Sequence, residues 1–202
     1  NTSRYYASQT IGNCESTSRL SVQVFLVSNS NITGFTGPPS PCPNTPITYS
    51  VNLVSGTTYT WSIPDGWSAS SSLSGLNLNS ISVSSGVAGN NGNIKVIAQN
   101  ACRTDSAFLA VSVTPAPAVS INSDYCVGNN QVKLTALPGS SPTYSYQWTS
   151  NGTNYSTDQA ITVGIAAVYK VKVTSAATGC FASATTTLSK ELVRNGNFEL
   201  GN

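Results

Sequence analysis

The sequence contains no histidine and few charged residues. Without histidine, neither a histidine-based catalytic triad nor an imidazole metal ligand can form. Only 8% of the 202 residues are charged, whereas an ordinary soluble domain has about 25%. Serine, threonine, asparagine and glycine are therefore expected to cover most of the surface. The formal net charge of +2 is too small to predict a nucleic-acid partner or binding to an anionic membrane.

Long apolar runs and the usual ligand-binding motifs are absent as well. No stretch approaches the roughly 18 apolar residues that span a bilayer, so we expect no membrane insertion. The five cysteines form no CxxC pair, the seven acidic residues form no calcium loop or acid–base pair, and no glycine-rich phosphate loop is present. We therefore predict no metal, no cofactor and no catalytic residue, and the chain is expected not to be an enzyme.

Two stretches of the chain place a cysteine, a Tyr-x-Trp sequence and a second cysteine in the same order. Their members are Cys42, Tyr59, Trp61 and Cys102 in the first stretch, and Cys126, Tyr146, Trp148 and Cys180 in the second. A Cys…Trp…Cys spacing among short alternating strands is typical of an immunoglobulin-like sandwich, whose tryptophan fills the core. The four aromatic residues are therefore predicted to be core residues. The predicted fold class is all-β, with tandem immunoglobulin-like sandwiches in an extended array.

A hairpin pattern recurs three times along the chain, which predicts three successive units. Each copy has an alternating strand, a polar turn that contains a cysteine, and a second alternating strand. The first strands are 5–10, 94–99 and 169–174, and the second strands are 20–26, 107–113 and 182–188.

The predicted domains follow from this repeat. Residues 1–28 are expected to be the C-terminal hairpin of a domain that begins earlier, because no further strands precede them and Asn1 begins abruptly in polar sequence. Residues 29–115 and 116–192 are each expected to form a sandwich, and the proline-rich joint at 114–117 is expected to be stiff. Residues 193–202 leave the pattern and are predicted to open a further, jelly-roll-like module or a linker.

The cysteines allow two pairings. Pairing within each unit joins Cys42 with Cys102 and Cys126 with Cys180. At about 3.3 Å per residue, however, the two cysteines of one unit should lie at opposite ends of a sandwich, roughly 20 Å apart, whereas a disulfide needs Cα atoms within about 7 Å. Head-to-tail stacking would bring Cys42 next to Cys180 across the joint, and this is the pairing we favour. Disulfides predict an extracytoplasmic location.

Trp67 has two interpretations. It follows the turn at Asp65 and Gly66, so its ring could be buried in the core or exposed as a platform for a sugar ligand.

Several motifs resemble surface proteins of the Bacteroidota. Cys42-Pro43, the segment 58–67 and Asn100-Ala101-Cys102 resemble a PKD-like domain, and residues 116–190 resemble the Ig-like repeats beside it. Residues 195–199 are similar to the start of a carbohydrate-binding jelly roll, in which a glutamate at the place of Glu199 often helps to hold a structural calcium. Asp105-Ser106-Ala107 matches the short O-glycosylation signal of that phylum, which implies a glycan on Ser106.

The resemblance implies a function. Such arrays occur in gliding-motility and adhesion filaments exported by the type IX route, so the chain is expected to be a non-catalytic spacer of a large bacterial cell-surface adhesin or filament. Its partners would be neighbouring repeats of the same chain, surface polysaccharide or other cell-surface proteins. One alternative is an accessory carbohydrate-binding or spacer region of a secreted polysaccharide-degrading enzyme. Another is a strand-donating fibre subunit, whose N-terminal hairpin completes a neighbour's sandwich.

Overall fold

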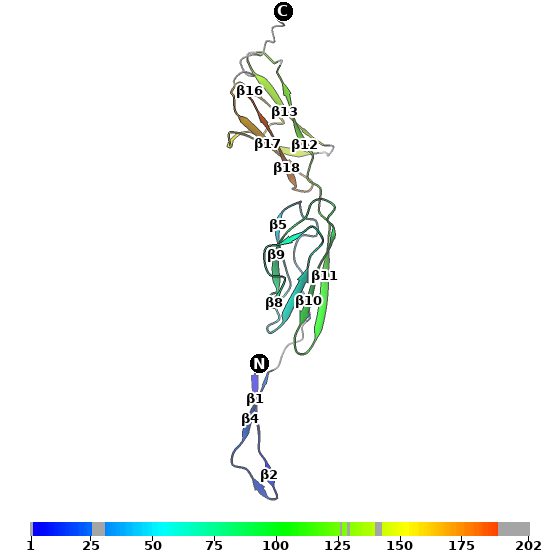
Figure 1. Cartoon of the computed structure of the whole chain (residues 1–202), viewed down its shortest axis with the longest axis vertical. Coiled ribbons are helices and arrows are strands. Elements are labelled where there is room, and N and C mark those ends of the chain that lie inside the picture. Colours follow the sequence, from blue (N-terminus) through cyan, green and yellow to red (C-terminus); the bar gives the residue numbers. More distant parts are fainter. Residues whose placement is uncertain (1, 26–30, 126, 129, 140–142, 190–202) are drawn as a thin grey trace, which may run out of the picture.

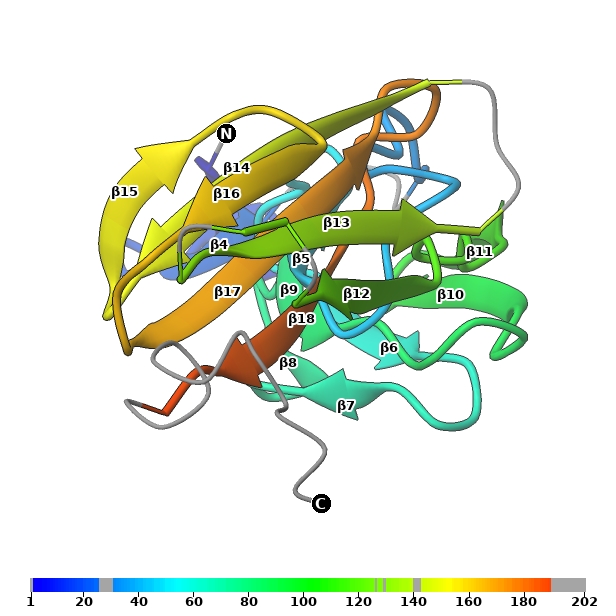
Figure 2. The same ribbon diagram turned by 90° about the horizontal axis from the view of Figure 1, so that it is seen from above.

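A computed structural model describes residues 2–25, 31–125, 127–128, 130–139 and 143–189. None of the described residues is helical, and the strands form a hairpin followed by two sandwiches along the long axis of the molecule (Figure 1). Seen along that axis, the second sandwich overlies the first (Figure 2). The predicted all-β fold class of tandem immunoglobulin-like sandwiches is confirmed.

The first sandwich has two antiparallel sheets, ordered β5-β9-β7 and β11-β10-β6-β8. Their strands are β5 (Pro46–Ser50), β6 (Thr58–Ser62), β7 (Ser68–Ala69), β8 (Ser74–Leu76), β9 (Ser80–Ser84), β10 (Gly92–Gln99) and β11 (Thr104–Val111). Alternation along β10 turns Ile94, Val96 and Ala98 into the core and leaves Lys95 exposed. The inner faces of the two sheets thus share one apolar core.

The aromatic residues at the centre of this core have their polar groups hydrogen-bonded. Trp61 is buried, and its indole N–H donates to the Leu78 carbonyl oxygen at 2.9 Å. The hydroxyl of the buried Tyr59 accepts from the Val54 amide at 2.8 Å. Because the indole N–H of Trp61 and the hydroxyl of Tyr59 are both hydrogen-bonded, burial of the two rings stabilises the core through their apolar area.

The second sandwich repeats the arrangement, with sheets ordered β12-β13-β16 and β15-β14-β17-β18. Its strands are β12 (Val119–Asp124), β13 (Val132–Pro138), β14 (Tyr144–Ser150), β15 (Thr153–Ser156), β16 (Ala160–Val163), β17 (Val168–Ser175) and β18 (Phe181–Thr187). Trp148 is fully buried opposite Val171, and its indole N–H donates to the Asp158 carbonyl oxygen at 2.9 Å. Tyr146, two residues earlier, is half-buried against the same core.

The N-terminal hairpin pairs β1 (Thr2–Ala7) with β4 (Leu20–Phe25), and β2 (Thr10–Ile11) with β3 (Cys14–Glu15) lie at its tip. The register places Tyr5 opposite Val22 and Ala7 opposite Leu20. These four side chains lie on one face, yet Tyr5 is 61% exposed and Leu20 is 70% exposed. The hairpin therefore has an apolar face that no described residue covers.

Trp67 requires a correction, because the exposed sugar platform considered from the sequence is wrong. The residue is only 8% exposed, and its indole N–H donates to the Asn90 carbonyl oxygen at 2.8 Å. Gly66 adopts a positive φ of 78°, which lets the chain turn sharply so that β7 joins β9. This turn directs the indole ring toward the core, 6.3 Å from the ring of Tyr49.

Candidate functional site

The candidate functional site is the joint between the two sandwiches, where hydrogen bonds and a disulfide connect segments that are far apart in the sequence. After β11, the connector (residues 112–118) runs beside the entry segment (residues 31–42), which leads into the first sandwich. The Ser112 amide donates to the Pro39 carbonyl oxygen at 2.9 Å, and the Thr114 amide donates to that of Pro41 at 2.8 Å. Pro115 and Pro117 follow, and their rings fix the backbone φ angle. The first part of the connector is thus fixed by hydrogen bonds to the entry segment, and the second part is stiffened by its two prolines.

A disulfide closes the joint. Cys42 is bonded to Cys180 with a Cα–Cα distance of 5.3 Å and a sequence separation of 138 residues. The cross-joint pairing is therefore present, and the alternative pairing within each unit, Cys42 with Cys102 and Cys126 with Cys180, is wrong. The reason is geometric, because Cys42 lies at the joint end of the first sandwich whereas Cys102 lies in the β10–β11 turn at the opposite end (Figure 1).

Both halves of the bridge are anchored by their own sandwich. The buried Ser85 hydroxyl donates to the Cys42 carbonyl oxygen at 2.6 Å, which ties the Cys42 segment to the end of β9. The Ser175 amide donates to the Cys180 carbonyl oxygen at 2.9 Å, and Cys180 is fully buried. Its Sγ atom lies 4.0 Å from the carbonyl oxygen of Thr114 in the connector. The bridge consequently links two fixed backbones rather than two loose loops.

Tyr49 also fixes the entry segment through a hydrogen bond. This tyrosine is buried, and its hydroxyl donates to the Pro38 carbonyl oxygen at 2.9 Å. Burial raises the pKa of Tyr49 to about 12. Gly37 lies within the segment and has a φ of 135°, and a Cβ atom there would lie 2.1 Å from the Tyr49 ring. Only glycine therefore allows the chain to pass this ring.

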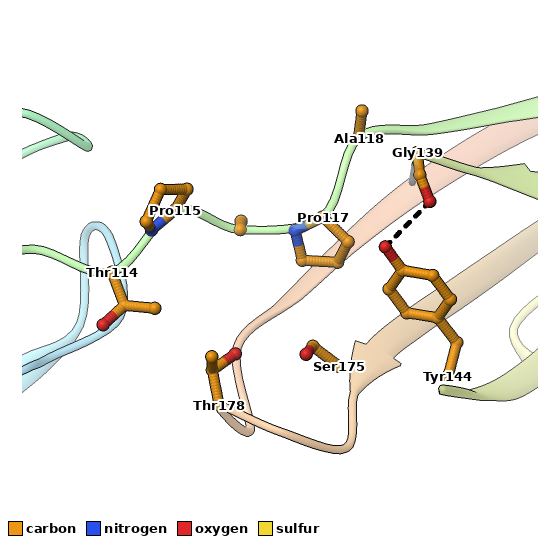
Figure 3. Close-up of a pocket in the computed structure, with 9 residues that line it drawn as sticks. Thr114, Pro115, Pro117, Ala118, Gly139, Tyr144, Ser175 and Thr178 are labelled. Atoms are coloured by element: carbon orange, nitrogen blue, oxygen red, sulfur yellow. Dashed lines mark hydrogen bonds between the residues drawn. The ribbon is translucent and has the colours of Figure 1, made fainter. Parts of the chain in front are cut away.

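A cavity of about 410 Å³ opens beside the connector (Figure 3). The Tyr144 hydroxyl points to the Gly139 carbonyl oxygen and donates to it at 2.9 Å, and Ser175 and Thr178 face the connector from the second sandwich. No carboxylate, amine, imidazole or thiol is present among the described residues that line the cavity. The polar side chains that line it are the hydroxyls of Thr114, Tyr144, Ser175 and Thr178.

Asp105, at the start of β11, links the beginning of the entry segment to the end of the first sandwich that lies away from the joint. Its carboxylate accepts hydrogen bonds from the Ile32 and Ser106 amides, each at 2.9 Å. These two backbone hydrogen bonds, that of Ile32 foremost, lower the pKa of Asp105 below its ordinary value. Ser106 is exposed on β11, and the glycan implied for it stays a prediction.

The remaining predicted sites lie apart from the joint. Cys14 and Cys102 are exposed, whereas Cys126 and Glu199 lie outside the described residues. Within the described ranges, no group of three or more histidine, cysteine or acidic residues could hold a metal ion. The same part of the chain has no helix with the length and apolar character to cross a membrane.

A polar depression on the second sandwich was not identified as a site from the sequence. It has a volume of about 360 Å³ and lies on the outer face of the β15-β14-β17-β18 sheet. Lys170 and Lys172 alternate along β17 with the buried residues Val171 and Val173, so both lysines lie on the outer face of the sheet. Sequence alternation gave no indication that Phe181 would lie against Lys172, because that contact depends on the pairing of β17 with β18.

Comparison with known proteins identifies one part of the chain. Residues 27–113 match the family model of the PKD-like domain, a range that contains the whole first sandwich. A search of curated proteins gives no match.

The solved structures that match include fragments of several domains. They include three N-terminal domains of the bacteriophage RB49 Highly Immunogenic Outer Capsid protein, at 20% identity and a TM-score of 0.39, covering 78% of this chain and 58% of that one. Extracellular domains 3–5 of Drosophila OTK match at 13% identity and a TM-score of 0.35, covering 84% and 66%. The I-band fragment I67–I69 from titin matches at 14% identity and a TM-score of 0.32, covering 79% and 65%. The chain spans less than two thirds of each of these three.

Proposed function

We propose that the chain is a non-catalytic, load-bearing spacer of an extracellular surface or adhesion protein. PKD-like and Ig-like sandwiches are typically extracellular and non-catalytic, and a disulfide suits that setting. The observation that carries the proposal is the bridge between Cys42 and Cys180, because it fixes one sandwich to the next at the point where a stack of domains would otherwise bend.

The bridge also changes the path that tension takes through the chain. Tension that enters before residue 31 passes along the entry segment to Cys42, crosses the disulfide to Cys180, and leaves through β18. The 138-residue separation between the two cysteines is thereby bypassed. Residues 43–179, which contribute most of both cores, lie inside this loop and cannot be extended by pulling while the bridge is intact.

Only the entry segment and β18 lie on this path, and both are held along their length. The Thr33 and Thr36 carbonyl oxygens accept from the Asn52 and Ser50 amides, at 2.8 Å and 3.2 Å. β18 pairs with β17 from Phe181 to Thr187. Hydrogen bonds of this kind must break together when strands slide along one another, which suits a part that carries load.

Single-molecule pulling on the bridged chain and on the C42A/C180A variant tests the proposal. The bridged chain is expected to release no extension from residues between the two cysteines. The variant is expected to release about 480 Å more, since extended chain spans roughly 3.5 Å per residue over the separation of 138 residues. Equal extension for the two proteins would reject the load-bearing role of the bridge.

Residues 1–28 are proposed to be the last hairpin of a further Ig-like unit. In the two sandwiches, β10 pairs with β6 and β17 pairs with β14, whereas β1 pairs only with β4 among the described residues. Its apolar face is therefore proposed to be covered by strands from the same polypeptide or from a neighbouring subunit. If a neighbour supplies them, V22D should reduce concentration-dependent assembly in sedimentation, and Q23D on the polar face should not.

The units 29–115 and 116–192 are proposed as the two sandwich domains, and the parent protein is proposed to be a surface adhesin or gliding filament of the Bacteroidota. The PKD-like match of residues 27–113 supports the first sandwich domain. The assignment to the Bacteroidota rests on the motif resemblance alone. Immunolabelling of intact cells with and without a working type IX translocon tests the export route. Unchanged surface label in the translocon mutant would reject it. The alternative role in a polysaccharide-degrading enzyme loses its sugar platform at Trp67, since that ring is buried.

A further inference from the structure

The outer face of the second sandwich combines cationic, amide and aromatic side chains in one depression of about 360 Å³. Cross-strand pairing sets Gln147 beside Lys172 on β14 and β17, and Lys172 beside Ser183 on β18. The next row contains Thr149 and Lys170. These side chains belong to alternate strand positions that point away from the core, so they form a continuous surface.

Two contacts organise this surface. The ammonium group of Lys172 lies 4.0 Å from the centroid of the Phe181 ring, and Phe181 is 52% exposed. The Gln147 side-chain amide donates to the Asn154 side-chain oxygen at 3.2 Å. The first contact orders a positive charge beside an accessible apolar ring, and the second orders two amides beside it.

The charged side chains that line the depression are all positive. Lys170 and Lys172 both line it, and no acidic residue is among the described residues that do so. The depression is therefore complementary in charge to an anionic ligand. Since β14 and β17 are interior strands, their backbone groups are already paired on both sides. An added peptide strand consequently has no backbone partner here, and recognition must come from side chains alone.

From these observations we infer that this face binds an acidic polysaccharide. Carboxylate or sulfate groups would pair with Lys170 and Lys172, sugar hydroxyls would bond to the amides of Gln147 and Asn154, and the apolar side of a sugar ring would pack on Phe181. All of these groups lie in the same depression. The inference does not depend on the spacer role, because the bridge and this face are separate parts of the molecule.

The first sandwich carries a related arrangement at the corresponding place. Lys95 on β10 is flanked by Ser62 on β6 and by Phe108 on β11. Phe108 is 68% exposed, and Lys95 points outward as well. A lysine beside an exposed phenylalanine thus occurs on the outer face of both four-stranded sheets. Two weak sites on one chain would bind a long polymer more tightly than either alone.

Binding to defined polymers tests the inference. Polygalacturonate and dextran sulfate supply carboxylates and sulfates, neutral dextran supplies neither, and polyglutamate and anionic phospholipid vesicles represent acidic peptides and membranes. Affinities are measured by calorimetry at low salt for the unmodified chain, K170Q/K172Q, F181A and K133Q. Lys133 is exposed on β13 of the other sheet, so K133Q is the matched control for loss of one charge.

The expected result is binding of at least one anionic polysaccharide, weakened about five- to tenfold by K170Q/K172Q and also weakened by F181A. K133Q should change the affinity less than twofold, about what a remote surface charge contributes. Thermal unfolding of each variant should match that of the unmodified chain, because all four substituted side chains are exposed or half-exposed. Binding of polygalacturonate alone identifies a uronate site, and binding of dextran sulfate alone identifies a sulfate site.

Four results would overturn the inference. They are no binding to either anionic polysaccharide, equal binding of neutral dextran, equal loss of affinity in K133Q, and equal or tighter binding of polyglutamate or vesicles. The pulling experiment on the bridge uses no ligand, so its outcome is independent of all four.

Discussion

Removing the cross-joint bridge is expected to destabilise both sandwiches at once. The Thr114 carbonyl oxygen lies 4.0 Å from the Sγ atom of Cys180, so the connector and the bridge meet at one point. If one sandwich unfolds while the other stays folded, the unfolded residues form a loop of about 70 residues. The disulfide holds one end of this loop, and the connector near Thr114 holds the other end against the folded sandwich. Closing a loop of that length removes unfolded-state entropy equivalent to about 4 kcal/mol at 25 °C. The C42A/C180A variant loses this contribution in both units.

Urea denaturation followed by tryptophan fluorescence measures the effect for each sandwich. Trp61 and Trp67 report on the first and Trp148 on the second. With a denaturant dependence of about 1 to 2 kcal/mol per molar for domains of this size, the midpoint of each transition should fall by roughly 2 to 4 M. The Cys14→Ser variant is the control and should not shift, since Cys14 is exposed in the hairpin. Unchanged midpoints in C42A/C180A, or destabilisation of only one sandwich, would refute the reasoning.

Three further substitutions test separate features. Trp148→Ala should cost about 3 to 5 kcal/mol of the unfolding free energy of the second sandwich, because a fully buried ring leaves a cavity; a fluorescence-independent readout such as circular dichroism checks this, and a loss below about 1 kcal/mol would contradict it. Asp105→Asn should lower stability at neutral pH and make stability fall less steeply in acid. The folded-state pKa of Asp105 is depressed, so the stability that its carboxylate contributes is lost as pH falls through that pKa. A variant whose stability depends on acid pH as that of the unmodified chain does would contradict this prediction. Tyr49→Phe should lower stability at neutral pH, because it removes the hydrogen bond to the Pro38 carbonyl oxygen. It should also reduce the loss of stability between pH 10 and about 12, because in that window the unfolded tyrosine ionises while the folded one, whose pKa is raised to about 12, stays protonated. Denaturation at pH 9, 10.5 and 12 measures both effects, and an unchanged slope of stability against alkaline pH would count against the assignment.

Alternation and cysteine position were sufficient to predict much of this fold. Strands of period two, each followed by a cysteine in a turn, specify which residues face the core, and Val96 and Val171 lie there as that pattern requires. The cross-joint bridge could be anticipated because Cys42 precedes its strand whereas Cys180 follows its own, which sets them at facing ends of neighbouring units. Both inferences use only the fixed rise of a strand.

Other features depended on conformations that the residue pattern does not specify. The orientation of Trp67 follows from the positive φ of Gly66 and from the two-residue strand β7, which is too short to show alternation. The contact between Lys172 and Phe181 requires the register of β17 with β18, which the turn at 176–180 sets. Sequence alternation places both residues on an outer face, but their distance along that face is decided by pairing.

The distance between the two sandwiches tests most directly whether the bridge makes them one rigid unit. Nitroxide labels at Thr60→Cys and Thr185→Cys, both exposed positions, would be placed in a chain in which serine replaces Cys14, Cys102 and Cys126. Pulsed dipolar spectroscopy is expected to give one narrow distance distribution with Cys42 and Cys180 bonded and a broad one in the C42A/C180A background. Equally broad distributions with and without the bridge would contradict the account.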